Sequence, residues 1–280
     1  MILSTRSQTA TTPVQSIPST QTGAAAAIAF DHVTKHFPSS KGAPLEVLRD
    51  ISFSVARDQI VAILGQSGAG KSTLLNLAAG LIPPDSGSVR ILNQDTRGTV
   101  DWGRVGYMFQ DDRLLPWRIA WKNVALALEA DDLPAAERAR RARAALDLVG
   151  LAEFAESYPH QLSGGMRSRV ALARSLVAQP DVLLMDEPFS RLDAQTRGSM
   201  HRELLRVQQL RRMSILFVTH DVEEAVVLAD RIVLLSPRPG RVRRDIEVTF
   251  AQPRVGTAET IALIAELRAA LEANHQEESR

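Results

Sequence analysis

One nine-residue segment constrains the fold of this chain more than any other: Gly65-Gln66-Ser67-Gly68-Ala69-Gly70-Lys71-Ser72-Thr73. It follows a short apolar run, Gln59 to Leu64, typical of a strand covered on both faces, and it leads into a predicted helix over Ser72 to Ala79. In this context a glycine-rich loop directs backbone N–H groups at phosphate oxygens, beside a helix N-terminus. A chance match in a chain of this length has a probability of about one in a hundred. The segment, here the phosphate loop, predicts a nucleoside triphosphate site with Lys71 on the β/γ-phosphates and Ser72 on Mg²⁺.

Composition excludes several other classes of protein. The 280 residues carry 33 Lys+Arg against 32 Asp+Glu, so no broad basic surface predicts a nucleic-acid partner. The absence of cysteine excludes disulfides, thiol nucleophiles and cysteine-ligated zinc. The longest uniform apolar run, Ala24 to Phe30, is too short to span a membrane. We therefore expect a soluble chain whose contact with a membrane is made through a protein partner.

The order of predicted elements indicates an α/β fold. Residues 1–27 are rich in Ser, Thr, Gln and Ala and predict a disordered tail. Strands are predicted over Ile51 to Val55, Gln59 to Leu64, Ser88 to Leu92, Arg104 to Phe109, Asp181 to Met185, Ile215 to Thr219, Arg231 to Leu235 and Val242 to Phe250. The segment from Leu114 to Ser163 is predicted to be helical, and later helices alternate with strands, as parallel sheets require. A last amphipathic helix would bury Ile261, Ile264, Leu267 and Leu271.

Two consecutive carboxylates follow one of the apolar strands. The run from Val182 to Met185 delivers Asp186 and Glu187 at its carboxyl end, where open α/β sheets bind ligands. Successive side chains of a strand point to opposite faces, so the two carboxylates cannot share one role. Asp186 suits the Mg²⁺ shell and Glu187 the polarisation of an attacking water, whereas an exposed acidic loop is the weaker interpretation.

A second glycine turn, Ser163-Gly164-Gly165, opens another predicted helix. Ser163 is a natural N-cap, and the glycines leave backbone N–H groups open to an anion. A capped helix start without a ligand is an equal interpretation when the turn is considered alone. One nucleotide could use both glycine segments only if two subunits face each other. Gln110 and His220 end two further predicted strands, where they could reach Mg²⁺ or water and the γ-phosphate, respectively.

Together these motifs resemble the ATP-binding subunit of an ABC transporter, over about residues 28–250. The resemblance implies a P-loop NTPase core with a parallel sheet, an antiparallel β-subdomain, a helical insertion at about 111–165, and a C-terminal helix and tail over 251–280. It implies a head-to-tail homodimer with ATP and Mg²⁺ between the phosphate loop of one subunit and the second glycine turn of the other. Lys71, Ser72, Gln110, Asp186, Glu187 and His220 would complete the site, and Ser190 to Asp193 would couple the subunits. Phe37 stands where the family stacks an aromatic ring on adenine, although core packing also explains a phenylalanine there.

Two segments are similar to importers of nitrate, aliphatic sulfonates and taurine, and to importers of a thiamine-precursor pyrimidine. They are Asp111 to Trp117 and Ser236 to Val242. Leu114, Leu115 and Trp117 would form an exposed apolar cluster for a helix of a permease, although core packing is as good an explanation for the two leucines. The resemblance implies a peripheral subunit on the cytoplasmic face of the inner membrane, indirectly linked to a solute-binding protein.

Departures from the family and rival functions complete the expectations. Ser168 stands where the family commonly has Gln, Arg191 where it has a small residue, and Met166 where Gln is frequent. A soluble ABC-type ATPase acting on DNA or ribosomes is the first rival, and a phosphate-loop kinase is the second. The arginine cluster Arg138, Arg140, Arg141 and Arg143 is interpreted as a solvated helix face, because no wider basic field surrounds it.

Overall fold

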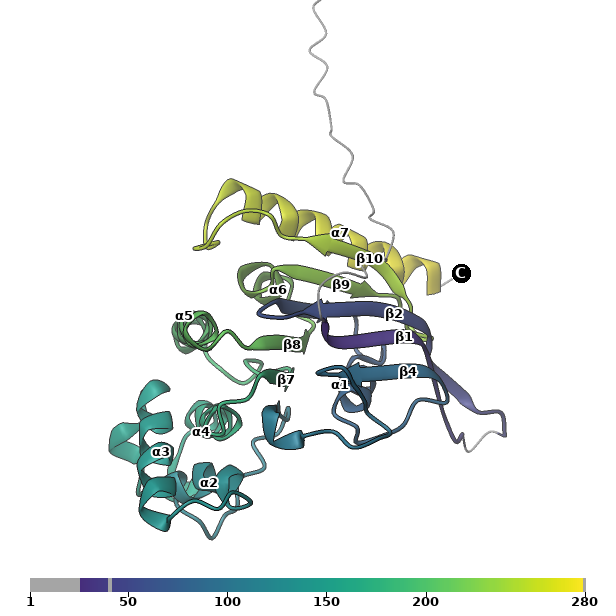
Figure 1. Cartoon of the computed structure of the whole chain (residues 1–280). Coiled ribbons are helices and arrows are strands. Elements are labelled where there is room, and N and C mark those ends of the chain that lie inside the picture. Colours follow the sequence, from purple (N-terminus) through teal and green to yellow (C-terminus); the bar gives the residue numbers. More distant parts are fainter. Residues whose placement is uncertain (1–25, 40–41, 279–280) are drawn as a thin grey trace, which may run out of the picture.

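Two sheets form the framework of the molecule (Figure 1). The computed structural model describes residues 26–39 and 42–278. The larger sheet has the order β10 (Val242–Glu247), β9 (Arg231–Leu235), β3 (Ile60–Leu64), β8 (Ser214–Thr219), β7 (Val182–Asp186) and β6 (Val105–Met108). Its neighbours are parallel except for β10, which is antiparallel to β9. The smaller sheet is antiparallel, with the order β2 (Leu45–Ala56), β1 (Ala26–Phe37), β4 (Ser86–Ile91) and β5 (Gln94–Asp95). The expected α/β class with a second, antiparallel sheet is confirmed.

Helices follow most strands of the larger sheet, and the last helix follows its last strand, β10. They are α1 (Lys71–Ala78), α2 (Ala120–Ala125), α3 (Ala135–Leu148), α4 (Gly164–Leu176), α5 (Ala194–Arg211), α6 (Val222–Leu228) and α7 (Ala258–Glu278). Four short 3₁₀ turns lie at Trp102–Arg104, Leu126–Leu128, Ala152–Phe154 and Pro159–Gln161. Both α2 and α3 lie between β6 and α4, in the segment expected to form the helical insertion, and pack beside α4 (Figure 1). These connections bring the carboxyl ends of β3, β6, β7 and β8 to one edge of the sheet.

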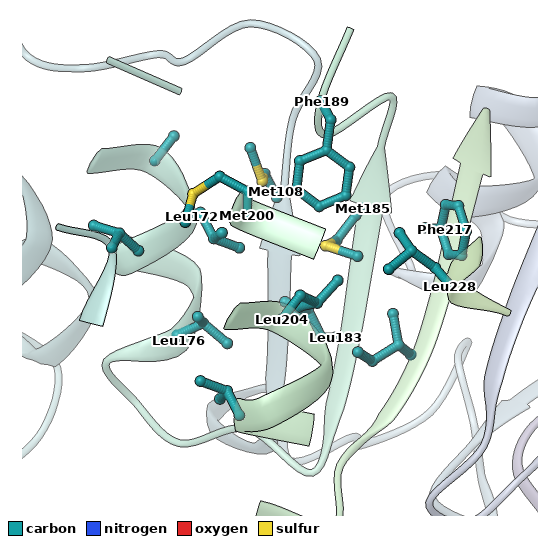
Figure 2. Close-up of a cluster of buried hydrophobic side chains, with 14 of the residues drawn as sticks. Met108, Leu172, Leu176, Leu183, Met185, Phe189, Met200, Leu204, Phe217 and Leu228 are labelled. Atoms are coloured by element: carbon teal, nitrogen blue, oxygen red, sulfur yellow. The ribbon is translucent and has the colours of Figure 1, made fainter. Parts of the chain in front are cut away.

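Both faces of the larger sheet are buried, which explains its nearly continuous apolar strands. In β3, Ile60, Ala62 and Leu64 belong to a cluster with the helices, whereas Val61 and Ile63 belong to a cluster with α1 and the smaller sheet. Figure 2 shows the first cluster around β7 and β8, where Leu183, Met185 and Phe217 are among the buried side chains. Close packing on both sides fixes the strand ends that carry the candidate site.

The structure corrects three predicted details. The first strand includes Ala26 and Ala27, so the tail expected over residues 1–27 cannot extend to its predicted boundary, and its remainder lies outside the described residues. β10 ends at Glu247, before Val248 and Phe250. Ile261 is 62% exposed, whereas Leu267 is fully buried. At 100° per residue, Ile261 lies about 120° around the helix from Leu267, while Ile264 and Leu271 lie within about 60° of it.

Candidate ATP-binding and hydrolysis site

The phosphate loop adopts a backbone that requires glycine at two positions. Gly68 and Gly70 have φ angles of 81° and 92°, in the left-handed region. A Cβ on Gly70 would also lie 2.7 Å from Cδ2 of Leu48. Gly70 is the N-cap of α1, so the loop enters the helix without a side chain in the way. This geometry leaves the backbone N–H groups at the helix start accessible to an anion.

Lys71 is buried at the first position of α1. Its Nζ donates to the carbonyl oxygens of Gly65 and Gln66, both at 2.9 Å. Burial lowers the pKa of Lys71, while the nearby carboxylates of Glu187 and Asp186 act in the opposite direction. An ammonium has three hydrogens, so one remains for an anionic oxygen. Lys71 therefore fits a phosphate-binding role.

Ser72 and Asp186 meet at the end of β7. The Ser72 hydroxyl donates to Oδ1 of Asp186 at 3.0 Å. Burial raises the pKa of Asp186, whereas the Ser72 hydrogen bond and the Lys71 charge lower it. A hydroxyl and a carboxylate are oxygen ligands of the kind Mg²⁺ prefers. These two residues would hold the ion, which would neutralise negative charge on the phosphates.

Glu187 follows the last residue of β7 and contacts different side chains from Asp186. Glu187 has a φ of 45°, and its N–H donates to the carbonyl of Val218 at 3.0 Å. Its Oε1 lies 3.2 Å from Nδ1 of His220, and its Oε2 accepts from Nε2 of Gln110 at 3.3 Å. Three strand ends thus bring Gln110, Glu187 and His220 together. The two carboxylates have different partners, although Glu187 lies beyond the strand and strand alternation is not the reason. The roles assigned to these residues stay predictions.

The second glycine turn is built as a capped helix start. Oγ of Ser163 accepts from the N–H of Met166 at 3.2 Å, and the buried Ser168 hydroxyl donates to the Gly164 carbonyl at 3.2 Å. A Cβ on Gly165 would lie 3.3 Å from Cδ2 of Leu192. Within the described residues, no hydrogen bond or ion pair joins residues 163–165 to residues 65–73. The contribution of this turn to a nucleotide site is therefore a prediction about a second subunit.

Peripheral residues of the predicted site differ in how the structure places them. Phe37 packs against the cluster beneath the smaller sheet, and Nζ of Lys35 lies 5.6 Å from its ring centre, so adenine stacking stays a prediction. Leu114 is buried in the helical core, so of the two interpretations of this leucine the structure supports core packing and not an exposed cluster. Leu115 is half-buried, whereas Trp117 is 71% exposed.

Arg191 forms an ion pair with Asp111, which joins the predicted coupling segment to the loop after Gln110.

Two neighbours of the phosphate loop were not anticipated. Nε2 of Gln66 donates to the Leu271 carbonyl of α7 at 3.0 Å, and a cavity of about 310 Å³ lies between this helix, the phosphate loop and His220. The Arg238 guanidinium donates to the Gly68 carbonyl at 3.2 Å. Sequence periodicity shows only that α7 is amphipathic and contains no signal for its partner. Arg238 lies in a segment singled out by resemblance alone.

Comparison with known proteins agrees with this geometry. Residues 48–190 match the family described as ABC transporter. Taurine import ATP-binding protein TauB of Pseudomonas entomophila is 45% identical over 227 residues, which cover 81% of this chain and 86% of that protein. Nitrate import ATP-binding protein NrtC of Synechococcus elongatus is 41% identical over 81% of this chain and 35% of that protein. A dimeric, post-hydrolysis ATP-binding cassette bound to ADP and Pi has a TM-score of 0.73 and 30% identity, covering 80% of this chain and 100% of that chain.

The fold and the site define a phosphate-loop ATPase with paired carboxylates. The chain belongs to the ABC transporter family, and it is an ATP-binding, ATP-hydrolysing subunit of that family. Among the residues that the structure describes, no helix is long and apolar enough to cross a bilayer.

Proposed function

We propose that this chain is the ATPase subunit of an importer for a small anionic or zwitterionic solute of the taurine, aliphatic sulfonate or nitrate class. It works as a head-to-tail homodimer on a pair of membrane permease subunits, at the cytoplasmic face of the cell membrane. A solute-binding protein delivers the solute from the other side. The names of the relatives support the solute class, because two of them are import proteins for taurine and nitrate.

The convergence of Lys71, Ser72, Asp186 and Glu187 at one sheet edge carries the hydrolytic part of this proposal. Lys71 and the phosphate-loop N–H groups bind the phosphates, and Ser72, Asp186 and Gln110 hold Mg²⁺. Glu187 accepts a proton from the attacking water, and His220 orients Glu187 and the γ-phosphate. Most of the rate enhancement comes from this positioning and from charge stabilisation.

The side of the chain that faces the permease includes Trp117. An indole that is 71% exposed leaves a large apolar surface in water, which favours coverage by a partner. Trp117 follows the Gln110 loop, so a helix seated on it can respond to closure around the nucleotide. This placement supports a coupling role. The rival activity on nucleic acid is disfavoured by the net charge of +1, which provides no excess of basic residues to bind phosphates.

Crosslinking tests the dimer directly, because the chain contains no native cysteine. A variant carrying Ser67→Cys is mixed with one carrying Ser163→Cys, both in a Glu187→Gln background that binds ATP without turning it over. We expect a disulfide between the two molecules that requires ATP. Controls replace Ser163→Cys with Ser86→Cys, an exposed site at the start of β4. Absence of the crosslink with ATP, or undiminished hydrolysis by Glu187→Gln, would refute the proposed motor.

A further inference from the structure

Two buried polar side chains lie behind the loop that carries His220. His201 of α5 and Glu224 of α6 are only 8% and 4% exposed. Nε2 of His201 lies 3.9 Å from Oε1 of Glu224, and neither atom has a hydrogen-bond partner among residues 26–39 and 42–278. Buried polar atoms of native proteins nearly always have partners, so this pair calls for a physical reason.

Glu224 holds both residues that flank His220. The Thr219 hydroxyl donates to Oε2 of Glu224, and the N–H of Asp221 donates to the same hydroxyl oxygen at 3.0 Å. Asp221 in turn caps α6, since its Oδ1 accepts from the N–H groups of Glu223 and Glu224 at 2.9 and 3.3 Å. The backbone before and after His220 therefore depends on the position of the Glu224 carboxyl group.

His201 contacts the turn that carries Glu187, through Phe189. Its ring packs edge-on against the buried Phe189, with ring centres 4.8 Å apart and an angle of 71° between the planes. Phe189 follows Glu187 in the same turn. One helical turn before His201, Nη1 of Arg197 lies 3.1 Å from Oδ2 of Asp221, so α5 and α6 meet at two successive positions.

We propose that His201 and Glu224 are positioning residues for ATP hydrolysis, whose buried contact fixes the His220 loop relative to Glu187. The proposal rests on the roles proposed above for Glu187 and His220, and it adds a site of proton binding beneath them. Neither residue touches the phosphate loop in the described structure. Their effect is therefore on turnover rather than on nucleotide affinity.

Protonation controls this contact. Burial raises the pKa of Glu224 to about 7 and lowers the pKa of His201 to about 4. Below neutral pH the protonated Glu224 can donate its O–H towards Nε2 of His201 after a small approach of the two groups. The charged groups that face the pair are Asp221, Arg197, Arg202 and Glu187. Ionisation of Glu224 removes this O–H donor and places a buried negative charge beside two of these carboxylates. The link to His201 is therefore lost as the pH rises, while the Thr219 hydroxyl still donates to Oε2.

Substitution of Glu224→Gln tests the proposal, with Glu223→Gln as a matched control. Glu223 is the preceding residue of α6, but its side chain is 62% exposed and pairs with Arg268. ATP turnover and KM of the full-length chain are measured with Mg²⁺ from about pH 6 to about pH 8.5. We expect the wild-type kcat to fall by about threefold or more as the pH rises through about 7, and Glu224→Gln to lack this step. KM for ATP stays within about twofold of wild type in both variants.

Identical pH profiles of kcat in wild type and Glu224→Gln would overturn the proposal, as would an equal change in Glu223→Gln. If wild type shows no hydrolysis at all, the proposed function fails instead, so the two failures are distinguishable. Infrared spectroscopy of the wild-type chain provides a readout independent of turnover: a protonated carboxyl band must disappear as the pH rises through about 7. If Glu224→Gln does not fold, this titration and the kcat of His201→Gln decide the question, and a band that does not titrate overturns it.

Discussion

The hydroxyl of Ser72 donates a hydrogen bond of 3.0 Å to Oδ1 of Asp186, across 114 positions of the sequence. Ser72 is the second residue of α1, which follows β3, and Asp186 ends β7, with β8 between the two strands. The contact joins the phosphate loop to the carboxylates, and it places a hydroxyl and a carboxylate where one Mg²⁺ ion can bind both.

Substitution of Ser72→Ala should remove the Mg²⁺-dependent part of ATP affinity. The alanine lacks the ligand oxygen, while Lys71 and the backbone N–H groups remain. We expect Mg²⁺ to strengthen ATP binding about tenfold less in the variant than in wild type, as measured by calorimetry with Mg²⁺ and with a chelator. Ser86→Ala, on an exposed strand end, should behave as wild type. An equal Mg²⁺ effect in Ser72→Ala would show that Ser72 is no ligand.

Alanine at Gly70 should destabilise the chain more than alanine at Gly42. Both glycines have left-handed backbones, with φ angles of 92° and 97°. The new Cβ meets Leu48 at 2.7 Å at position 70 and nothing within 4 Å at position 42. We expect a loss of about 1 kcal/mol at Gly42 and about 2–4 kcal/mol at Gly70, from urea unfolding. Equal losses at the two positions would exclude the predicted clash.

Substitution of Trp117→Ala should weaken binding to the permease without destabilising the fold. The exposed indole contributes little to the core, so the free energy of unfolding should change by less than about 0.5 kcal/mol. Co-purification with the permease should be lost. Leu114→Ala, which removes a buried side chain, should instead cost about 2–4 kcal/mol. Permease binding that survives Trp117→Ala would place the coupling surface elsewhere.

Removal of either His201 or Glu224 should change how the free energy of unfolding depends on pH. The two changes should have opposite signs. Glu224 has a raised pKa of about 7, so its contribution to stability is lost as the pH rises from about 4.5 to about 7. His201 has a lowered pKa of about 4, so its contribution is lost as the pH falls from about 6.5 to about 4. The two contributions oppose each other between about pH 4.5 and about pH 6.5.

Relative to wild type, His201→Gln should therefore lose stability as the pH rises through this window, and Glu224→Gln should gain it. Each difference should amount to about 2–3 kcal/mol at most across the window, measured by urea unfolding at several pH values. Parallel curves for both variants would show that the two groups do not titrate in this range.

Local patterns predicted the chemistry-bearing segments because each of them is contiguous in the chain. The phosphate loop requires only nine neighbouring residues, and Ser163 caps its helix through a hydrogen bond to Met166. Strand alternation predicted different roles for Asp186 and Glu187, but the strand ends at Asp186 and Glu187 has a left-handed backbone, so its partners follow from the turn after β7. The sequence left core packing and exposure open for Leu114, and it wrongly placed Ile261 on the buried face of its helix, because apolar character alone does not determine which side chains are buried.

The sequence by itself determined that the chain forms an α/β fold with a phosphate-binding loop, since backbone conformation and hydrophobic alternation act over a few residues. The tertiary structure alone decided that α7 reaches Gln66, that Arg238 reaches Gly68, and that His201 faces Glu224. These contacts join segments that no local periodicity relates. Their geometry follows from how two buried faces of a sheet pack against helices, which is a property of the whole chain.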